Sequence, residues 1–176
     1  MRKVLYIFGL LTDADAAWMA RTGQKRPLVD GEVVIQEGVP TDSIVVLLEG
    51  TLRISAHGFG DIARLGVGEI VGEVSLVDSA PPSATVTAEG ECLALFIDKA
   101  RLKQKLDSDI AFGSRFYRAL AVFLADRLRA TRRLPSADGG LADEGMVVDG
   151  ELDPGIVENV SSAGERFIRL LNILRS

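Results

Sequence analysis

The spacing of hydrophobic and polar positions changes along the chain and predicts two kinds of structure. Between Leu28 and Asp98, short runs rich in valine, isoleucine, leucine and threonine recur at close spacing, with glycines between them. Short apolar runs with glycine corners are typical of an antiparallel barrel or sandwich. The stretch AHGFGD at 56–61 contains two glycines that can take positive φ, so it predicts a hairpin turn. We therefore expect a mainly β domain here.

Helical patterns flank this β region. The stretch TDADAAWMART at 12–22 begins with Thr12 as a candidate N-cap and predicts a short N-terminal helix. After Asp98 the apolar period changes to about 3.6 residues and predicts a short helix over 98–106, then a long helix over 109–134 that Pro135 ends. One face of the long helix is apolar, and it suits either packing on the β domain or a dimer seam. This face comprises Phe112, Phe116, Leu120, Phe123, Leu124 and Leu128.

The last part of the chain differs in composition. Residues 135–160 are rich in glycine, proline and acidic residues, which predicts a linker after a domain at 1–134. Residues 161–176 return to helical spacing and predict a C-terminal amphipathic helix. A helix this short needs a surface to pack on: its own β domain, a second subunit or a protein partner.

Composition narrows the classes of function. The net charge of -5 disfavours gripping nucleic-acid phosphates, and the basic residues Arg127, Arg129, Arg132 and Arg133 suit the negative end of the long helix dipole as a solvated tail. One cysteine, Cys92, and one histidine, His57, lie far apart in the chain. This inventory supports no disulfide, no metal site and no catalytic pair, so we expect no enzyme. Cys92 is expected to be a small buried apolar residue.

The N-terminus and the hydropathy of the chain indicate where the protein works. Two basic residues precede the apolar stretch VLYIFGLL, but Asp13 and Asp15 crowd the position where a signal peptide would be cleaved. No apolar run approaches the ~20 residues that a membrane span needs. We therefore expect a cytoplasmic protein with no membrane segment.

Four stretches, in this order, carry a family resemblance: EGVPTDS at 37–43, EGTLRIS at 49–55, RLGVGEIVGEVSLVD at 64–78 and PPSATVTA at 81–88. They resemble the cyclic-nucleotide-binding domain family, whose members include catabolite activator protein, regulatory subunits of protein kinase A and nucleotide-gated channels. The resemblance covers roughly residues 10–134. It implies an antiparallel β-roll, a jelly-roll-like double-stranded β-helix, with a short helix before it and a long helix after it. It also implies that GEVSLVDSAPPSATV at 72–86 is the phosphate-binding cassette, the name used below for this segment.

The cassette supplies the candidate site. Gly72 lets the backbone approach a ligand closely, and Val74 and Ser75 begin a helical turn with free N–H groups. The resemblance implies that Glu73 binds the ribose 2′-hydroxyl, while a charge at the start of a helix is the structural alternative. The predicted ligand-binding residues are Gly72, Glu73, Val74, Ser75, Pro82, Ser83, Ala84 and Thr85.

The cassette departs from the family pattern at one position. Members that bind cAMP or cGMP usually have Pro-Arg-x-Ala-Thr, where this chain has Pro81-Pro82-Ser83-Ala84-Thr85. Pro82 therefore stands where the phosphate-binding arginine is expected, and proline carries neither charge nor donor. Arg53 and Arg64 lie on predicted strands, and the sequence does not tell whether either faces the pocket.

Three functions follow from these patterns. The first is a stand-alone regulatory sensor that binds cAMP, cGMP or another nucleotide-type ligand, with a homodimer formed through the helix 109–134 and a protein partner at 161–176. The alternative is a ligand-free β-roll that serves as a structural or protein–protein interaction module. A transcription regulator ranks third, because residues 135–176 predict one helix where a helix-turn-helix needs two.

Overall fold

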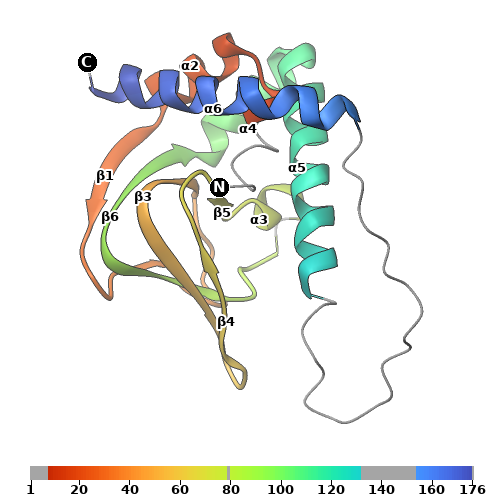
Figure 1. Ribbon diagram of the computed structural model, residues 1–176. Coiled ribbons are helices and arrows are strands. Elements are labelled where there is room, and N and C mark those ends of the chain that lie inside the picture. Colours follow the sequence, from red (N-terminus) through yellow and green to blue (C-terminus); the bar gives the residue numbers. More distant parts are fainter. Residues whose placement is uncertain (1–7, 79, 132–153, 176) are drawn as a thin grey trace.

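Figure 1 shows a computed structural model of the chain, which describes residues 8–78, 80–131 and 154–175. A rolled antiparallel β-sheet forms the centre, and helices from both ends of the chain cover it. This is the predicted β-roll with flanking helices. In chain order the elements are α2 (Asp13–Thr22), β1 (Gln24–Leu28), β2 (Val33–Ile35), β3 (Ser43–Ala56), β4 (Gly60–Leu65), β5 (Ile70–Val71), α3 (Val74–Val77), β6 (Thr85–Asp98), α4 (Lys99–Ser108), α5 (Ile110–Thr131) and α6 (Pro154–Arg175).

Two long strands, β3 and β6, organise the sheet. They pair antiparallel from Ser43 opposite Asp98 to Ser55 opposite Thr85, and β1, β2, β4 and β5 add to them. The sequence predicted each long strand as two short runs with a glycine between them. The chain instead continues through Gly50, whose φ is +94°. A Cβ at Gly50 would lie 2.5 Å from the sulfur of Cys92, so the two strands cross too closely there for any other residue.

The first half of β3 is buried on both faces, which explains its unbroken apolar run from Ile44 to Leu48. Ile44, Val46 and Leu48 point to a core shared with the helices. Val45 and Leu47 alternate with them and point into the roll. Because neighbouring side chains on a strand face opposite ways, a strand between two cores needs apolar residues at every position.

Helices α2, α4 and α5 cover the outer face of the roll. The N-cap prediction for α2 is confirmed, since Thr12 and Asp15 form a reciprocal capping box. On α5 the predicted apolar face divides. Phe112, Phe116, Leu120 and Phe123 are buried in the chain's own core, whereas Leu128 is 61% exposed. No helix within the described residues is long and apolar enough to cross a membrane.

Helix α6 packs on the chain's own N-terminal segment (Figure 1). The rings of Phe8 and Phe167 lie 5.4 Å apart, and Arg166 donates hydrogen bonds to the backbone carbonyls of Phe8 and Gly9. The helix begins at Pro154, inside the segment predicted as a linker; the rest of that segment, 135–153, lies outside the described residues. The sequence left three packing surfaces open for this helix. In the structure its apolar side packs on the chain itself.

Candidate functional site

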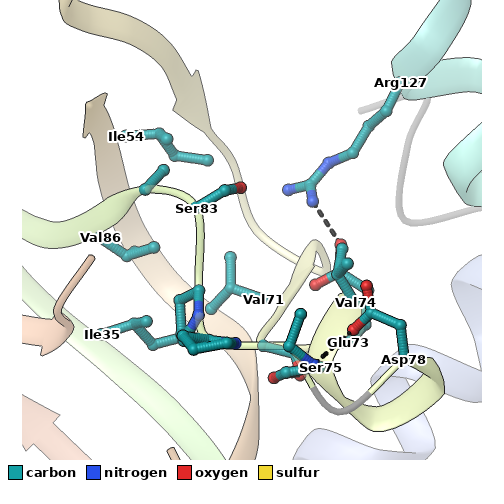
Figure 2. Close-up of a pocket in the computed structure, with 15 residues that line it drawn as sticks. Ile35, Ile54, Val71, Glu73, Val74, Ser75, Asp78, Ser83, Val86 and Arg127 are labelled. Carbon is teal, nitrogen blue, oxygen red and sulfur yellow. Dashed lines mark hydrogen bonds and ion pairs between the residues drawn. The ribbon is translucent and has the colours of Figure 1, made fainter. Parts of the chain in front are cut away.

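A cavity of about 270 Å³ lies between the roll, the cassette and the C-terminal half of α5. Figure 2 shows its labelled side chains. Residues from four parts of the chain line it: Ile35, Ile54, Val71, Gly72, Glu73, Val74, Ser75, Asp78, Ala80, Pro81, Pro82, Ser83, Ala84, Val86 and Arg127.

The cassette leaves the sheet at Gly72. Strand β5 pairs with β3 through Val71 and Ile70, and the chain then turns into the single helical turn α3. Gly72 has φ +79°, and a Cβ on it would lie 2.8 Å from the backbone oxygen of Ser43. Glycine is therefore required here both by its backbone conformation and by the close approach to β3.

Glu73 is the buried acid of the site. It is only 2% exposed, and its Oε1 accepts a hydrogen bond from Nη1 of Arg127 at 2.5 Å. Burial raises the pKa of Glu73, and this effect outweighs the opposite pull of the Arg127 charge. The pair therefore ties the cassette to α5 across 54 residues of sequence.

Arg127 lines the cavity, a position that the sequence pattern did not predict. It was predicted as part of a solvated tail, but its side chain is 26% exposed, faces the cavity and lies 4.6 Å from the ring centre of Phe123. A signal was present, because Arg127 lies one helical turn after Phe123 and so continues the buried face of α5. The same prediction included three other basic residues. The side chain of Arg129, and residues 132 and 133 as a whole, lie outside what the structure describes.

The two arginines named as candidates from the roll have other partners. Arg53 pairs with Asp61 at 2.9 Å, and Arg64 pairs with Glu89 at 2.9 Å. Both pairs are exposed, and neither arginine lines the cavity. The strands of the roll therefore do not supply the charge that Pro82 lacks.

Seven of the eight predicted ligand-binding residues line the cavity, and Thr85 does not. The hydroxyl of Thr85 instead accepts a hydrogen bond from the backbone N–H of Glu37 at 3.1 Å. The carbonyl of Pro82 accepts one from Gly38 at 2.8 Å. Thr85 and Pro82 thus fasten the end of the cassette to the turn after β2.

Lys99 supports the cassette from outside the cavity. Its ammonium donates to the hydroxyl of Ser75 at 2.6 Å and to the carbonyl of Thr41 at 2.7 Å. Desolvation lowers the pKa of Lys99, against the attraction of Asp42 and Glu73. Its charge therefore lies beside Ser75 at the start of α3, and Lys99 does not line the cavity.

The walls of the cavity divide by chemistry. Ile35, Ile54, Val71 and Val86 form an apolar wall, and Glu73, Asp78 and Arg127 supply charged groups (Figure 2). An apolar wall with a few convergent polar groups is the usual character of a site for a small organic ligand. This arrangement suits binding of a ring-containing molecule with hydroxyl and anionic groups.

Comparison with known proteins identifies this region. Residues 25–109 match the sequence model of the family described as the cyclic nucleotide-binding domain. The chain contains a cyclic nucleotide-binding domain. The matched range includes the cassette and nearly all of the roll but ends just before α5, so the family match does not reach Arg127.

Solved structures agree with this domain. A cyclic nucleotide-binding domain from Methylobacillus flagellatus has a similar fold, with a TM-score of 0.68 and 23% identity over 80% of this chain and 85% of that one. The N-terminal domain of a transcriptional regulator from Streptomyces coelicolor matches with a TM-score of 0.61 and 27% identity, covering 80% of this chain and all (100%) of that one.

A curated relative shares the domain within a longer protein. A Rhodopseudomonas palustris protein named as a potassium channel is 32% identical over 99 residues, which are 55% of this chain and 24% of that protein. The chain therefore spans less than a quarter of this relative's length.

Proposed function

We propose that the chain is a regulatory sensor whose cyclic nucleotide-binding domain holds a small nucleotide-type ligand, such as cAMP or cGMP, against the cassette. The observation that carries this proposal is the open cavity, which seven predicted cassette residues line. Its volume of about 270 Å³ is just below the ~300–1,000 Å³ that is typical of ligand pockets. A cassette that had lost its ligand would have no reason to keep this space free of side chains.

The role of each group follows from its position. The apolar wall of Ile54, Val71 and Val86 suits the body of the ligand, while Glu73 can accept a hydrogen bond from a sugar hydroxyl. Ligand binding would then act on α5, since Glu73 connects to that helix through Arg127. A ligand that prefers one arrangement of cassette and helix shifts the population toward it. Such a chain transmits a signal and catalyses no reaction.

Isothermal titration of the full chain with cAMP, cGMP and cyclic dinucleotides tests the proposal. We expect saturable binding of at least one of them, with one site per chain. Replacing Ser83, a cavity residue, with the larger Leu should abolish this binding, while the exposed change Lys103→Ala on α4 should leave it intact. Absence of heat from every compound at millimolar concentration would reject the sensing function.

A second candidate function, assembly through α5, is favoured by an exposed seam on that helix. Ile110, Tyr117 and Leu128 are 82%, 47% and 61% exposed. Together with Ser114, Ala121 and Leu124 they follow an alternating spacing of four and three residues, which is the pattern of a two-helix supercoil. We propose that two copies of the chain pair along this seam, which meets the buried face of the same helix at Leu124.

Sedimentation analysis tests the pairing. The wild-type chain should be a dimer at micromolar concentration, and Tyr117→Glu should make it monomeric because two carboxylates would meet in the seam. The change Arg101→Glu, on the exposed side of α4, should leave the dimer intact. A wild-type chain that sediments as a monomer would contradict the assembly.

A further inference from the structure

We propose, on the basis of the sensing function above, that Arg127 of α5 supplies the positive charge for the ligand's phosphate that the cassette itself lacks. The cassette has proline at position 82, and proline offers no donor and no charge. A cyclic phosphate is an anion, and burying it without a cation would be costly. The charge must therefore enter the cavity from another element.

Arg127 meets this need by position. Among the described residues that line the cavity, it is the one that carries a positive charge. Figure 2 shows its guanidinium reaching from α5 toward Glu73, with the side chain of Ser83 pointing toward it from the cassette. Arg127 and Ser83 of the cassette thus bound the same part of the cavity.

Other cations are placed elsewhere. Arg53 and Arg64 pair with acids on the exposed side of the roll and do not line the cavity. Lys99 donates to Ser75 and Thr41 from outside the cavity. Each of these three cations already has a partner, and none of them lines the cavity.

The contact with Glu73 explains how the long side chain of Arg127 is kept in position beside the cavity. The carboxylate of Glu73 and the ring of Phe123 fix the guanidinium at the edge of the cavity. A guanidinium is planar and presents donors along several edges, so it can hold a carboxylate on one edge and a phosphate on another. Glu73 would thereby orient Arg127 as well as bind a sugar hydroxyl, and the ligand would join cassette and helix through both residues.

Comparing cAMP with adenosine, which lacks the phosphate, isolates this role. Isothermal titration of the full wild-type chain should show cAMP binding about tenfold to a hundredfold more tightly than adenosine. In Arg127→Gln this preference should fall to near one, because the phosphate has lost its cation. Adding Pro82→Arg to Arg127→Gln should restore the preference, since the arginine then comes from the cassette. The exposed change Arg118→Gln on the same helix should retain the wild-type preference.

Loss of folding is controlled by a double variant. Glu73→Gln/Arg127→Gln leaves no unpaired buried carboxylate behind, and its preference for cAMP should also fall to near one. A wild-type preference in Arg127→Gln overturns the inference. Binding of cAMP by Pro82→Arg but not by the wild type also overturns it, while leaving the cavity as a nucleotide site. Failure of every variant, Pro82→Arg included, to bind cAMP rejects the sensing function and the inference together.

Discussion

Replacing Arg127 with glutamine lowers the free energy of unfolding by about 3 kcal/mol at pH 8, because it leaves the Glu73 carboxylate buried without its guanidinium. Glu73 is 2% exposed, so water cannot take over the role of Arg127. Chemical denaturation of the wild type and the variant at one pH measures the loss. Arg53→Gln, which breaks the exposed pair with Asp61, should change stability by less than about 1 kcal/mol.

The same variant should depend on pH in a defined direction. Burial already raises the pKa of Glu73, and removing Arg127 removes the largest influence that lowers it. The folded state then binds a proton at a pH where the unfolded state has released it, so stability falls as pH rises from the unfolded pKa through the folded pKa. The deficit of Arg127→Gln should therefore be small near pH 5 and largest at pH 8. A deficit that is equal at both pH values would contradict a buried carboxylate, as would a double variant Glu73→Gln/Arg127→Gln no more stable than Arg127→Gln at pH 8.

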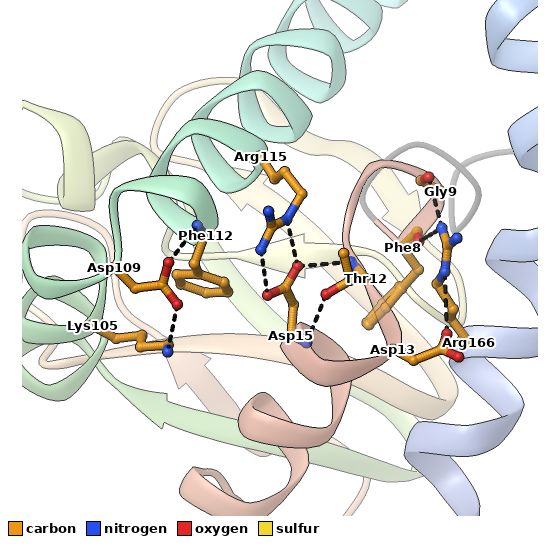
Figure 3. Close-up of polar contacts among 10 residues, drawn as sticks. All are labelled: Phe8, Gly9, Thr12, Asp13, Asp15, Lys105, Asp109, Phe112, Arg115 and Arg166. Atoms are coloured by element: carbon orange, nitrogen blue, oxygen red, sulfur yellow. Dashed lines mark hydrogen bonds and ion pairs between the residues drawn. The ribbon is translucent and has the colours of Figure 1, made fainter.

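Replacing Asp15 with alanine also lowers the free energy of unfolding by about 3 kcal/mol, because it removes a two-bond ion pair and a helix cap. Arg115 donates to both oxygens of Asp15, at 2.8 and 2.9 Å, and the backbone N–H of Thr12 donates at 2.7 Å (Figure 3). Asp15 is 4% exposed, and the pair joins α2 to α5. Thermal or chemical denaturation at pH 7 measures the change. Asp13→Ala is the matched control, because Asp13 is on the same helix but its side chain is 51% exposed.

The contribution of Asp15 should disappear in acid. Burial alone would raise the pKa of Asp15, but the hydrogen bonds from Arg115 and Thr12 outweigh it and lower the pKa. An acid with a lowered folded pKa stabilises the fold above its unfolded pKa of about 4 and loses this effect as pH falls through the folded value. The difference between wild type and Asp15→Ala should be constant from pH 5 to 8 and shrink below about pH 4. A difference that persists unchanged in acid would mean that the charge of Asp15 contributes nothing.

The fold could be predicted because its signals are local. Glycine corners separate the apolar runs, and the change of period after Asp98 marks where the sheet ends and the helices begin. The sequence did not show that short runs join into β3 and β6. Gly50 suggests a turn in the sequence, but in the structure it lies where β3 and β6 approach each other closely. The start of α6 at Pro154 was missed because glycine, proline and acidic residues resemble a linker.

Part of the site could be predicted because its signals, too, are local in the sequence. The cassette is one continuous segment, so the spacing of Gly72, Glu73 and Ser83 indicated which residues would meet. Arg127 is 54 positions from its partner, and only the crossing of α5 over the cassette brings them together. Thr85 shows that a residue of the motif need not line the cavity, since its hydroxyl accepts a hydrogen bond from the turn after β2.

The backbone amide spectrum of the isotope-labelled full chain, recorded during titration with cAMP and cGMP, tests whether the cavity is a ligand site. We expect saturable shifts of the amides of Gly72, Glu73, Ser75, Ser83 and Ala84, together with Arg127, while exposed positions of β1 and β4 remain unchanged. Spectra in which these amides do not move at millimolar nucleotide, or in which shifts are scattered over the surface without saturation, would contradict the assignment of the cavity as a ligand site.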